Sequence, residues 1–204
     1  MVVMSLGDRI GRSLFVGLAV GLAWGIRGDF GHLVGAMYPG AILALAFAYV
    51  SGQRSLFLWM PVLAILGSLA VGLGGHMSYG ILHGYAQSDT LVNYSYGFLT
   101  LFLQGSAWGT FGGGLIGLIL ERERVRTGDW LGYLGSIFIG AWVTYFLVVI
   151  VLGFHITPPR SDSSIAFFGA TVGQFAWLAL NRRFVGLRGA FFAYVGFGLG
   201  MSTG

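Results

Sequence analysis

The charged residues of this chain are few and clustered, and they leave long uncharged runs between them. These runs cover residues 13–26, 30–53, 55–88, 90–120, 130–159, 163–181 and 189–204. A helix needs about 20 predominantly apolar residues to cross the hydrocarbon core of a bilayer. Most of the runs reach that length, so the sequence predicts a chain that crosses a membrane several times.

The composition excludes most other classes of protein. Hydrophobic residues make up 56% of the 204 residues and charged residues only 9%, whereas about 25% of a soluble domain is charged. An ordinary soluble domain, a disordered chain and a nucleic-acid-binding module are therefore excluded, and the expected partner is the lipid bilayer. The chain has no cysteine, which excludes disulfides and thiolate metal sites.

The predicted architecture is an all-α membrane protein, a bundle of six to seven transmembrane helices in a single domain over residues 1–204. Membrane β-strands would show alternating segments of about ten residues. The expected helices lie near residues 10–28, 32–51, 54–74, 97–120, 130–153, 164–181 and 187–204. The last apolar stretch is short and has no polar tail, which is also what a fragment of a longer chain would show.

The arginines predict how the helices are oriented. All 11 basic residues are arginine, and cytoplasmic loops of membrane proteins carry an excess of positive charge. If the N-terminus is cytoplasmic, only Arg27 and Arg160 fall on the outer side. The other nine fall inside: Arg9, Arg12, Arg54, Arg122, Arg124, Arg126, Arg182, Arg183 and Arg188. We therefore expect a multi-pass membrane protein with a cytoplasmic N-terminus.

Glycines recur at every fourth residue in two of the expected helices. They are Gly17, Gly21 and Gly25 in one, and Gly105, Gly109, Gly113 and Gly117 in the other. Such stripes let helix backbones approach closely inside a membrane. They predict tight helix packing, within the chain or in a homo-oligomer. A hinge or a pore lining is the alternative.

The first candidate site surrounds Arg27 and Asp29. Only 14 uncharged residues separate Arg12 from Arg27, about 21 Å of helix, while the hydrocarbon core is about 30 Å thick. Arg27 and Asp29 are therefore expected within the outer leaflet or at its edge, where charges pair or line a cavity. Their pairing in a glycine-rich turn would leave backbone N–H groups open to a ligand, with His32 close by. The alternative is a snorkelling arginine beside a turn-capping aspartate.

The second candidate site is the expected outer loop that begins at His76. It is rich in hydrogen-bonding aromatic residues, among them Tyr79, and His83 follows His76 by seven residues. That spacing is about 10 Å along a helix, too far for one metal ion without a break. A small-molecule pocket, an interfacial tyrosine belt and a metal or haem site all remain open. No metal and no cofactor is assigned.

A third segment carries two further polar residues. His155 and Arg160 flank two prolines in another expected outer loop. They would cap an outer pocket, or the loop is simply rigid because proline fixes the backbone.

Two motifs carry a resemblance to known proteins. They are Trp24–Gly40 (Trp-Gly-Ile-Arg-Gly-Asp-Phe-Gly-His-Leu-Val-Gly-Ala-Met-Tyr-Pro-Gly) and Gly74–Gly80 (Gly-Gly-His-Met-Ser-Tyr-Gly). Together they resemble a group of multi-pass bacterial membrane proteins with no assigned activity. The resemblance implies a bacterial inner-membrane location and a longer parent chain, and it implies no reaction.

The leading functional hypothesis is a permease-like or small-ligand-binding membrane protein, whose polar site opens to the outer face. The expected ligand is a small polar or anionic molecule, because broken, glycine-rich helix ends build such sites in transporters. The expected ligand-binding residues are Arg27, Asp29, His32, His76, Tyr79 and His83. One alternative is a membrane-embedded enzyme acting on a lipid or sugar at the outer leaflet. Another is a structural subunit of a membrane complex. No catalytic motif decides whether the chain is an enzyme.

Overall fold

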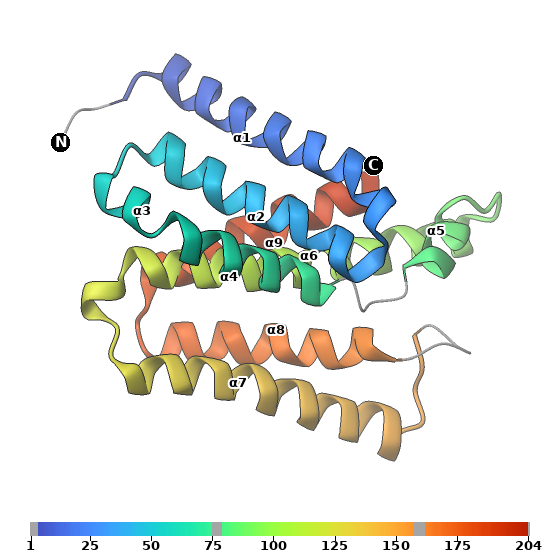
Figure 1. Ribbon diagram of the computed structural model, residues 1–204. Helices are drawn as coiled ribbons and strands as arrows, with labels where there is room; N and C mark the ends of the chain where they lie inside the picture. The colour runs from blue at the N-terminus through green and yellow to red at the C-terminus, as the bar shows by residue number, and fades with distance from the viewer. Residues whose placement is uncertain (1–3, 75–78, 157–161, 204) are drawn as a thin grey trace. The chain divides into compact units, whose positions relative to one another are not determined.

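The computed structural model describes residues 4–74, 79–156 and 162–203, with the side chains of residues 32 and 33 left out. The described part is helical and contains no strand, so the predicted all-α class is confirmed (Figure 1). The chain divides into two compact units, residues 1–75 and 76–204. The single domain expected from the sequence stays a prediction.

Unit 1 (residues 1–75) consists of helices centred on α2. Their bounds are α1 (Leu6–Ile26), the 3-10 turn η1 (Arg27–Phe30), α2 (His32–Ser51), α3 (Arg54–Leu58) and α4 (Met60–Gly74). Helix α2 lies between α1 and α4 and packs against both (Figure 1). The first two predicted helices are thus confirmed, with the first starting earlier and ending in a 3-10 turn.

The predicted helix over residues 54–74 is interrupted once. Trp59 has φ of −97° and ψ of 1°, outside helical geometry, and separates α3 from α4. Pro61 explains the break, because it has no N–H to donate to the carbonyl group four residues earlier. The helix resumes at once, since the Leu63 N–H donates to the Trp59 carbonyl at 2.8 Å.

Unit 2 (residues 76–204) is built around one long helix. Its elements are α5 (Gly80–Ala86), α6 (Leu91–Leu120), the 3-10 turn η2 (Arg122–Arg124), α7 (Thr127–Tyr145), the π-helical turn η3 (Phe146–Val151), α8 (Ser163–Leu180) and α9 (Phe184–Thr203). Helix α6 packs against α5, α8 and α9, and α7 packs against α8 (Figure 1). The sequence did not predict α5, and α6 begins six residues before the expected start at residue 97.

Five of the described helical segments are long and apolar enough to cross a membrane. They are Leu6–Phe30, Val34–Ser51, Thr127–Val151, Ser163–Leu180 and Phe184–Thr203. Helix α4 has only 15 residues. Helix α6 has 30, but its glycines and polar side chains make it less apolar. A multi-pass membrane protein is compatible with these helices, and a count of six to seven spans stays a prediction.

Helix α6 is largely enclosed by the rest of unit 2. More than half of its residues are buried against the rest of unit 2. A helix enclosed by other helices does not need an apolar surface toward lipid, whereas a helix in contact with lipid does. The described helices around α6 therefore satisfy the apolar requirement, and α6 is free to carry polar groups.

The glycine stripe of α6 is the contact surface for α9. A Cβ atom added to Gly105, Gly109 or Gly113 would lie less than 3.0 Å from a backbone carbonyl oxygen of α9. The two backbones thus touch directly, as small residues allow in membrane helices. The predicted tight packing is confirmed for this helix.

The glycine stripe of α1 behaves differently. A Cβ atom added to Gly17, Gly21 or Gly25 would meet no described atom within 4 Å. Ala23 is the buried residue of α1, and it lies on another face of the helix. The prediction that this stripe packs tightly within the bundle is therefore wrong for unit 1, and a role in a homo-oligomer stays a prediction.

The two stripes should respond differently to the same substitution. Gly109→Ala is expected to lower the free energy of unfolding by about 1–3 kcal/mol, because its new methyl group overlaps the α9 backbone. Gly21→Ala, the matched control, is expected to leave it unchanged or raise it by up to about 1 kcal/mol through helix propensity. Denaturant unfolding of the detergent-solubilised protein measures both. Equal losses in the two variants would contradict the different packing.

Candidate functional site

The structure places Arg27 and Asp29 together in η1, at the end of α1. The guanidinium carbon of Arg27 lies 4.2 Å from the ring centre of Trp24, which is cation–π geometry. A Cβ atom on Gly35 would lie less than 3.0 Å from the Arg27 carbonyl oxygen, so η1 packs directly on α2. The side chain of Asp29 is exposed.

Gly31 makes the reversal from η1 into α2. Its φ of 74° and ψ of −179° fall in a region of backbone space that is accessible essentially only to glycine. A side chain at this position would therefore strain the turn that holds Arg27 against α2. The glycine-rich turn has a structural role whether or not it binds a ligand.

Tyr79 immediately precedes α5 and His83 lies within this helix, which packs beside α6. The ring centre of Tyr79 is 5.6 Å from that of His83 and 5.9 Å from that of Trp108, both with edge-on geometry. At the other end of α5, Gly97 lies directly against the backbone of Ala86. Helix α5 is thus packed along the first part of α6, and Trp108 joins the predicted aromatic cluster.

Of the six predicted ligand residues, Tyr79 and His83 are seen in contact with each other. Arg27 and Asp29 belong to the other unit, and the His32 side chain and all of His76 lie outside the described part. A single site shared by all six therefore stays a prediction. Among the described residues, no group of three or more His, Asp or Glu side chains is placed to hold a metal ion.

Sequence reasoning missed a set of polar side chains inside unit 2, here called the polar row. It comes from α6, α7 and α8. Each of its side chains has 0% of its surface exposed: Gln104, Thr110, Tyr133, Ser164 and Gln174. Burial of uncharged polar groups is unfavourable unless they are hydrogen-bonded, so the contacts within the row matter.

Two hydrogen bonds of the polar row join α6 to α8. Gln104 Nε2 donates to Ser164 Oγ at 2.7 Å, and Gln174 Nε2 donates to the Thr110 carbonyl oxygen at 2.7 Å. Ser164 and Gln174 are ten residues apart on α8, or about 15 Å. The row therefore follows the long direction of the unit and is not a single isolated contact.

The centre of the polar row depends on Gly114. A Cβ atom there would lie less than 3.0 Å from both Gln174 Nε2 and the Tyr133 hydroxyl oxygen. The missing side chain thus gives room for two polar groups to converge on the backbone of α6. Within the described part of the chain, Gln174 Oε1 and the Tyr133 hydroxyl are buried without a hydrogen-bond partner. A buried polar group in that state costs about 1–3 kcal/mol.

Ion pairs lie at the two ends of unit 2. Where α8 begins, His155 Nδ1 lies 2.5 Å from Asp162 Oδ2, and the Asp162 side chain is only 8% exposed. At the opposite end, called the basic end, Arg183 Nη2 lies 2.6 Å from Asp129 Oδ2. His155 is therefore at one end of the row, and its role as a cap on an outer pocket stays a prediction; Arg160 lies outside the described residues.

One signal in the sequence was available for the polar row. Gln104 and Gln174 stand inside the helices expected at residues 97–120 and 164–181. Amide side chains within membrane helices commonly hydrogen-bond to other helices. A search based on charge overlooks them because they are neutral.

Comparison with protein-family models, with curated proteins and with solved structures finds no match. The functional argument for this chain therefore rests on its own residues.

The contact around Gly114 is testable by a double-mutant cycle. Gly114→Ala is expected to displace the Gln174 amide and to lower the free energy of unfolding by about 1 kcal/mol, the value of one hydrogen bond. Gln174→Ala removes the same bond. The loss of unfolding free energy in the double variant is expected to be smaller than the sum of the two single losses. The difference, which is the coupling energy of the two residues, should be about 0.5–3 kcal/mol. Strictly additive losses in denaturant unfolding would show that the two residues do not share a contact.

Proposed function

We propose that this chain is a permease-like membrane protein that binds a small, uncharged polar molecule and carries it across the bilayer. The observation that carries the proposal is the polar row of unit 2. Its side chains are fully buried and follow the long direction of the unit. Two of its groups also retain unused hydrogen-bonding capacity, the Tyr133 hydroxyl and Gln174 Oε1.

The chemistry of the row favours an uncharged solute. Its groups are amides, hydroxyls and one phenol, and the ion pairs His155–Asp162 and Asp129–Arg183 lie at the two ends. An ion moved into such an interior would need a compensating charge, because desolvation of an unpaired charge is very unfavourable. A neutral solute needs only donors and acceptors, which the row provides. An anionic ligand would instead require a positively charged side chain such as Arg27 to balance its charge.

A purely structural explanation of the row accounts for part of it. Hydrogen bonds such as Gln104 to Ser164 hold membrane helices together and contribute about 0.6 kcal/mol each. They do not account for the Tyr133 hydroxyl, which has no partner in the described part of the chain. If the row only joined helices, phenylalanine would serve as well at this position. Tyr133 therefore separates the two explanations.

Tyr133→Phe should reduce transport without reducing stability. We expect the flux of small neutral solutes, such as urea, glycerol or formamide, into proteoliposomes to fall about 2- to 10-fold. That range corresponds to the loss of one hydrogen bond to the solute. The free energy of unfolding should stay the same or rise, since a buried group without a partner is removed. Stopped-flow light scattering measures the flux.

Tyr145→Phe is the matched control, because Tyr145 lies on the same helix and is 39% exposed. It should leave the flux unchanged. Wild-type protein that moves none of these solutes faster than empty liposomes would contradict the proposed function. A destabilised Tyr133→Phe variant with unchanged flux would favour the structural explanation.

The proposal includes an orientation in a bacterial inner membrane, with the N-terminus in the cytoplasm. It is supported by the basic end of unit 2, where η2 carries Arg122 and Arg124 and the turn between α8 and α9 carries Arg182 and Arg183. The hydrogen bond from Arg183 Nη1 to the Arg124 carbonyl oxygen joins these two segments at 2.8 Å. Basic residues are concentrated in cytoplasmic loops, which supports a cytoplasmic location for this end.

The absence of natural cysteine allows a clean test of this orientation. Asp89→Cys and Gly128→Cys each introduce one thiol at an exposed position. A membrane-impermeant maleimide added to intact cells is expected to label Asp89→Cys, and Gly128→Cys only after permeabilisation. The reverse pattern would overturn the proposed orientation.

A second candidate function is an enzyme acting on a lipid or sugar at the outer leaflet. The observation in its favour is the His155–Asp162 pair, because a carboxylate at Nδ1 orients an imidazole to act as a base through Nε2. The His155 side chain is 47% exposed, which leaves it accessible to a substrate. This candidate predicts that Tyr133→Phe leaves the activity unchanged, so the transport experiment separates the two functions.

A further inference from the structure

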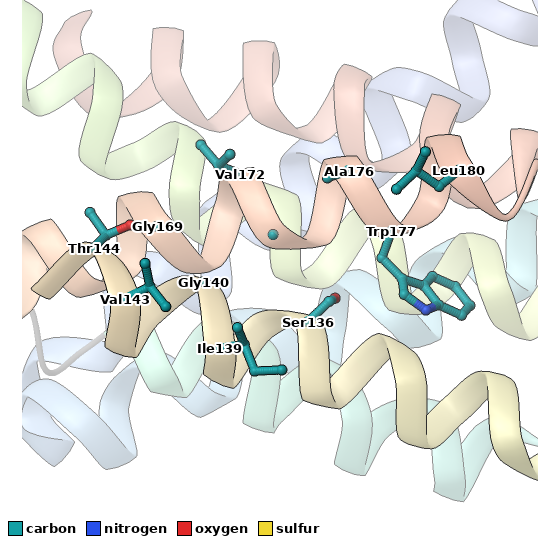
Figure 2. A pocket seen from close by; sticks show the side chains of 11 residues that line it. Ser136, Ile139, Gly140, Val143, Thr144, Gly169, Val172, Ala176, Trp177 and Leu180 are labelled. Atoms are coloured by element: carbon teal, nitrogen blue, oxygen red, sulfur yellow. The ribbon is translucent and has the colours of Figure 1, made fainter. Parts of the chain in front are cut away.

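An apolar groove of about 460 Å³ lies between α7 and α8 on the surface of unit 2. Figure 2 shows the side chains along it, with Thr144 toward one end and Trp177 and Leu180 toward the other. Ile139 and Val143 line it from α7, and Val172 lines it from α8. Almost all of the exposed lining is hydrocarbon.

Small residues form the floor of this groove. A Cβ atom on Gly140 would lie less than 3.0 Å from the Gly169 carbonyl oxygen, and one on Gly173 less than 3.0 Å from the Ser136 carbonyl oxygen. The two backbones thus touch while the larger neighbouring side chains stand on either side. The result is a narrow and almost entirely apolar channel along the helices.

The groove has the length of one leaflet. Along α8 it extends from Gly169 to Leu180, which is about 16 Å at 1.5 Å per residue. Half of a hydrocarbon core of about 30 Å is about 15 Å. A single extended acyl chain of one leaflet therefore matches the length of the groove.

One end of the groove opens at the basic end. Leu180 precedes the turn at Arg182, and Arg126 immediately precedes α7; both arginines are exposed. Three acids lie at this end. Asp129 pairs with Arg183, Glu121 Oε1 accepts from the Val185 N–H at 2.5 Å, and Glu123 is exposed. The arginines at positions 122, 124, 126, 182 and 183 outnumber these acids, so net positive charge lies next to the mouth of an apolar groove.

We propose that the groove is a binding site for an anionic phospholipid. One acyl chain lies between α7 and α8, and the phosphate headgroup lies among the exposed arginines, Arg126 and Arg182. Basic residues at a membrane surface attract anionic headgroups, and guanidinium groups match phosphate in geometry and charge. The positive charge of the arginines argues against a second apolar helix as the occupant, because an apolar helix has no negative charge for these arginines to attract.

This inference does not depend on the proposed transport function, because it uses the outer faces of α7 and α8 and not the polar row. Native mass spectrometry of the full chain, released from detergent, tests it directly. The probes are phosphatidylglycerol and phosphatidylcholine with identical acyl chains, added together in equal amounts. We expect at least a fivefold excess of the phosphatidylglycerol adduct.

Two kinds of variant separate the headgroup from the chain. Arg126→Gln and Arg182→Gln should each lower the ratio of phosphatidylglycerol to phosphatidylcholine adducts about fivefold, the effect expected for one arginine at an anionic surface. Arg9→Gln, at an exposed position of unit 1, should leave the ratio unchanged. Val172→Phe fills the groove and should lower the adducts of both lipids.

Val151→Phe is the matched control for Val172→Phe. Val172 and Val151 are 68% and 60% exposed, so neither substitution disturbs a packed interior, and only Val172 lines the groove. Equal adducts of the two lipids on wild-type protein would overturn the proposal. So would equal effects of the two valine variants, because the basic end would then attract lipid without the groove. A mass spectrum that shows a second copy of the chain bound in place of lipid would also overturn it.

Discussion

Direct contact between helix backbones is the interaction on which unit 2 depends. In a bilayer, lipid tails are as apolar as leucine, so association relies on close packing and hydrogen bonds. Glycines allow two pairs of helix backbones to touch. Helices α6 and α9 touch at Gly105, Gly109 and Gly113, and helices α7 and α8 touch at Gly140 and Gly169. The first contact buries α6, and the second leaves an apolar groove above its floor.

The burial of α6 has a chemical consequence. Once α6 is enclosed, its side chains meet protein and not lipid, and polar groups become acceptable if they find partners. Gln104 donates a hydrogen bond to Ser164, and Gln174 donates one to the carbonyl oxygen of Thr110. The low dielectric constant of such an interior strengthens each hydrogen bond and raises the cost of each unpaired group. The Tyr133 hydroxyl and Gln174 Oε1 are therefore groups in the row that packing alone does not explain.

The sequence predicted the positions of the long helices well, because the length of each uncharged run between arginines limits the length of the apolar helix that it can form. It predicted the glycine contact of α6 correctly, whereas the α1 stripe makes no such contact within unit 1, since the spacing of glycines is the same in both and only the neighbouring helix differs. It missed α5, whose seven residues are too few to show a pattern. It missed the polar row because the bonded pairs stand 60 and 64 residues apart.

The sequence by itself determined that this chain is an all-helical protein suited to a membrane, because hydropathy and charge spacing act residue by residue. Tertiary structure decided which polar groups are buried together and which glycine faces are filled. Tyr133 and Gln174 meet only because Gly114 leaves room between them, and Arg182 lies beside a groove only because α7 and α8 touch. These are contacts between helices, and the order of residues along the chain does not show which helices will lie side by side.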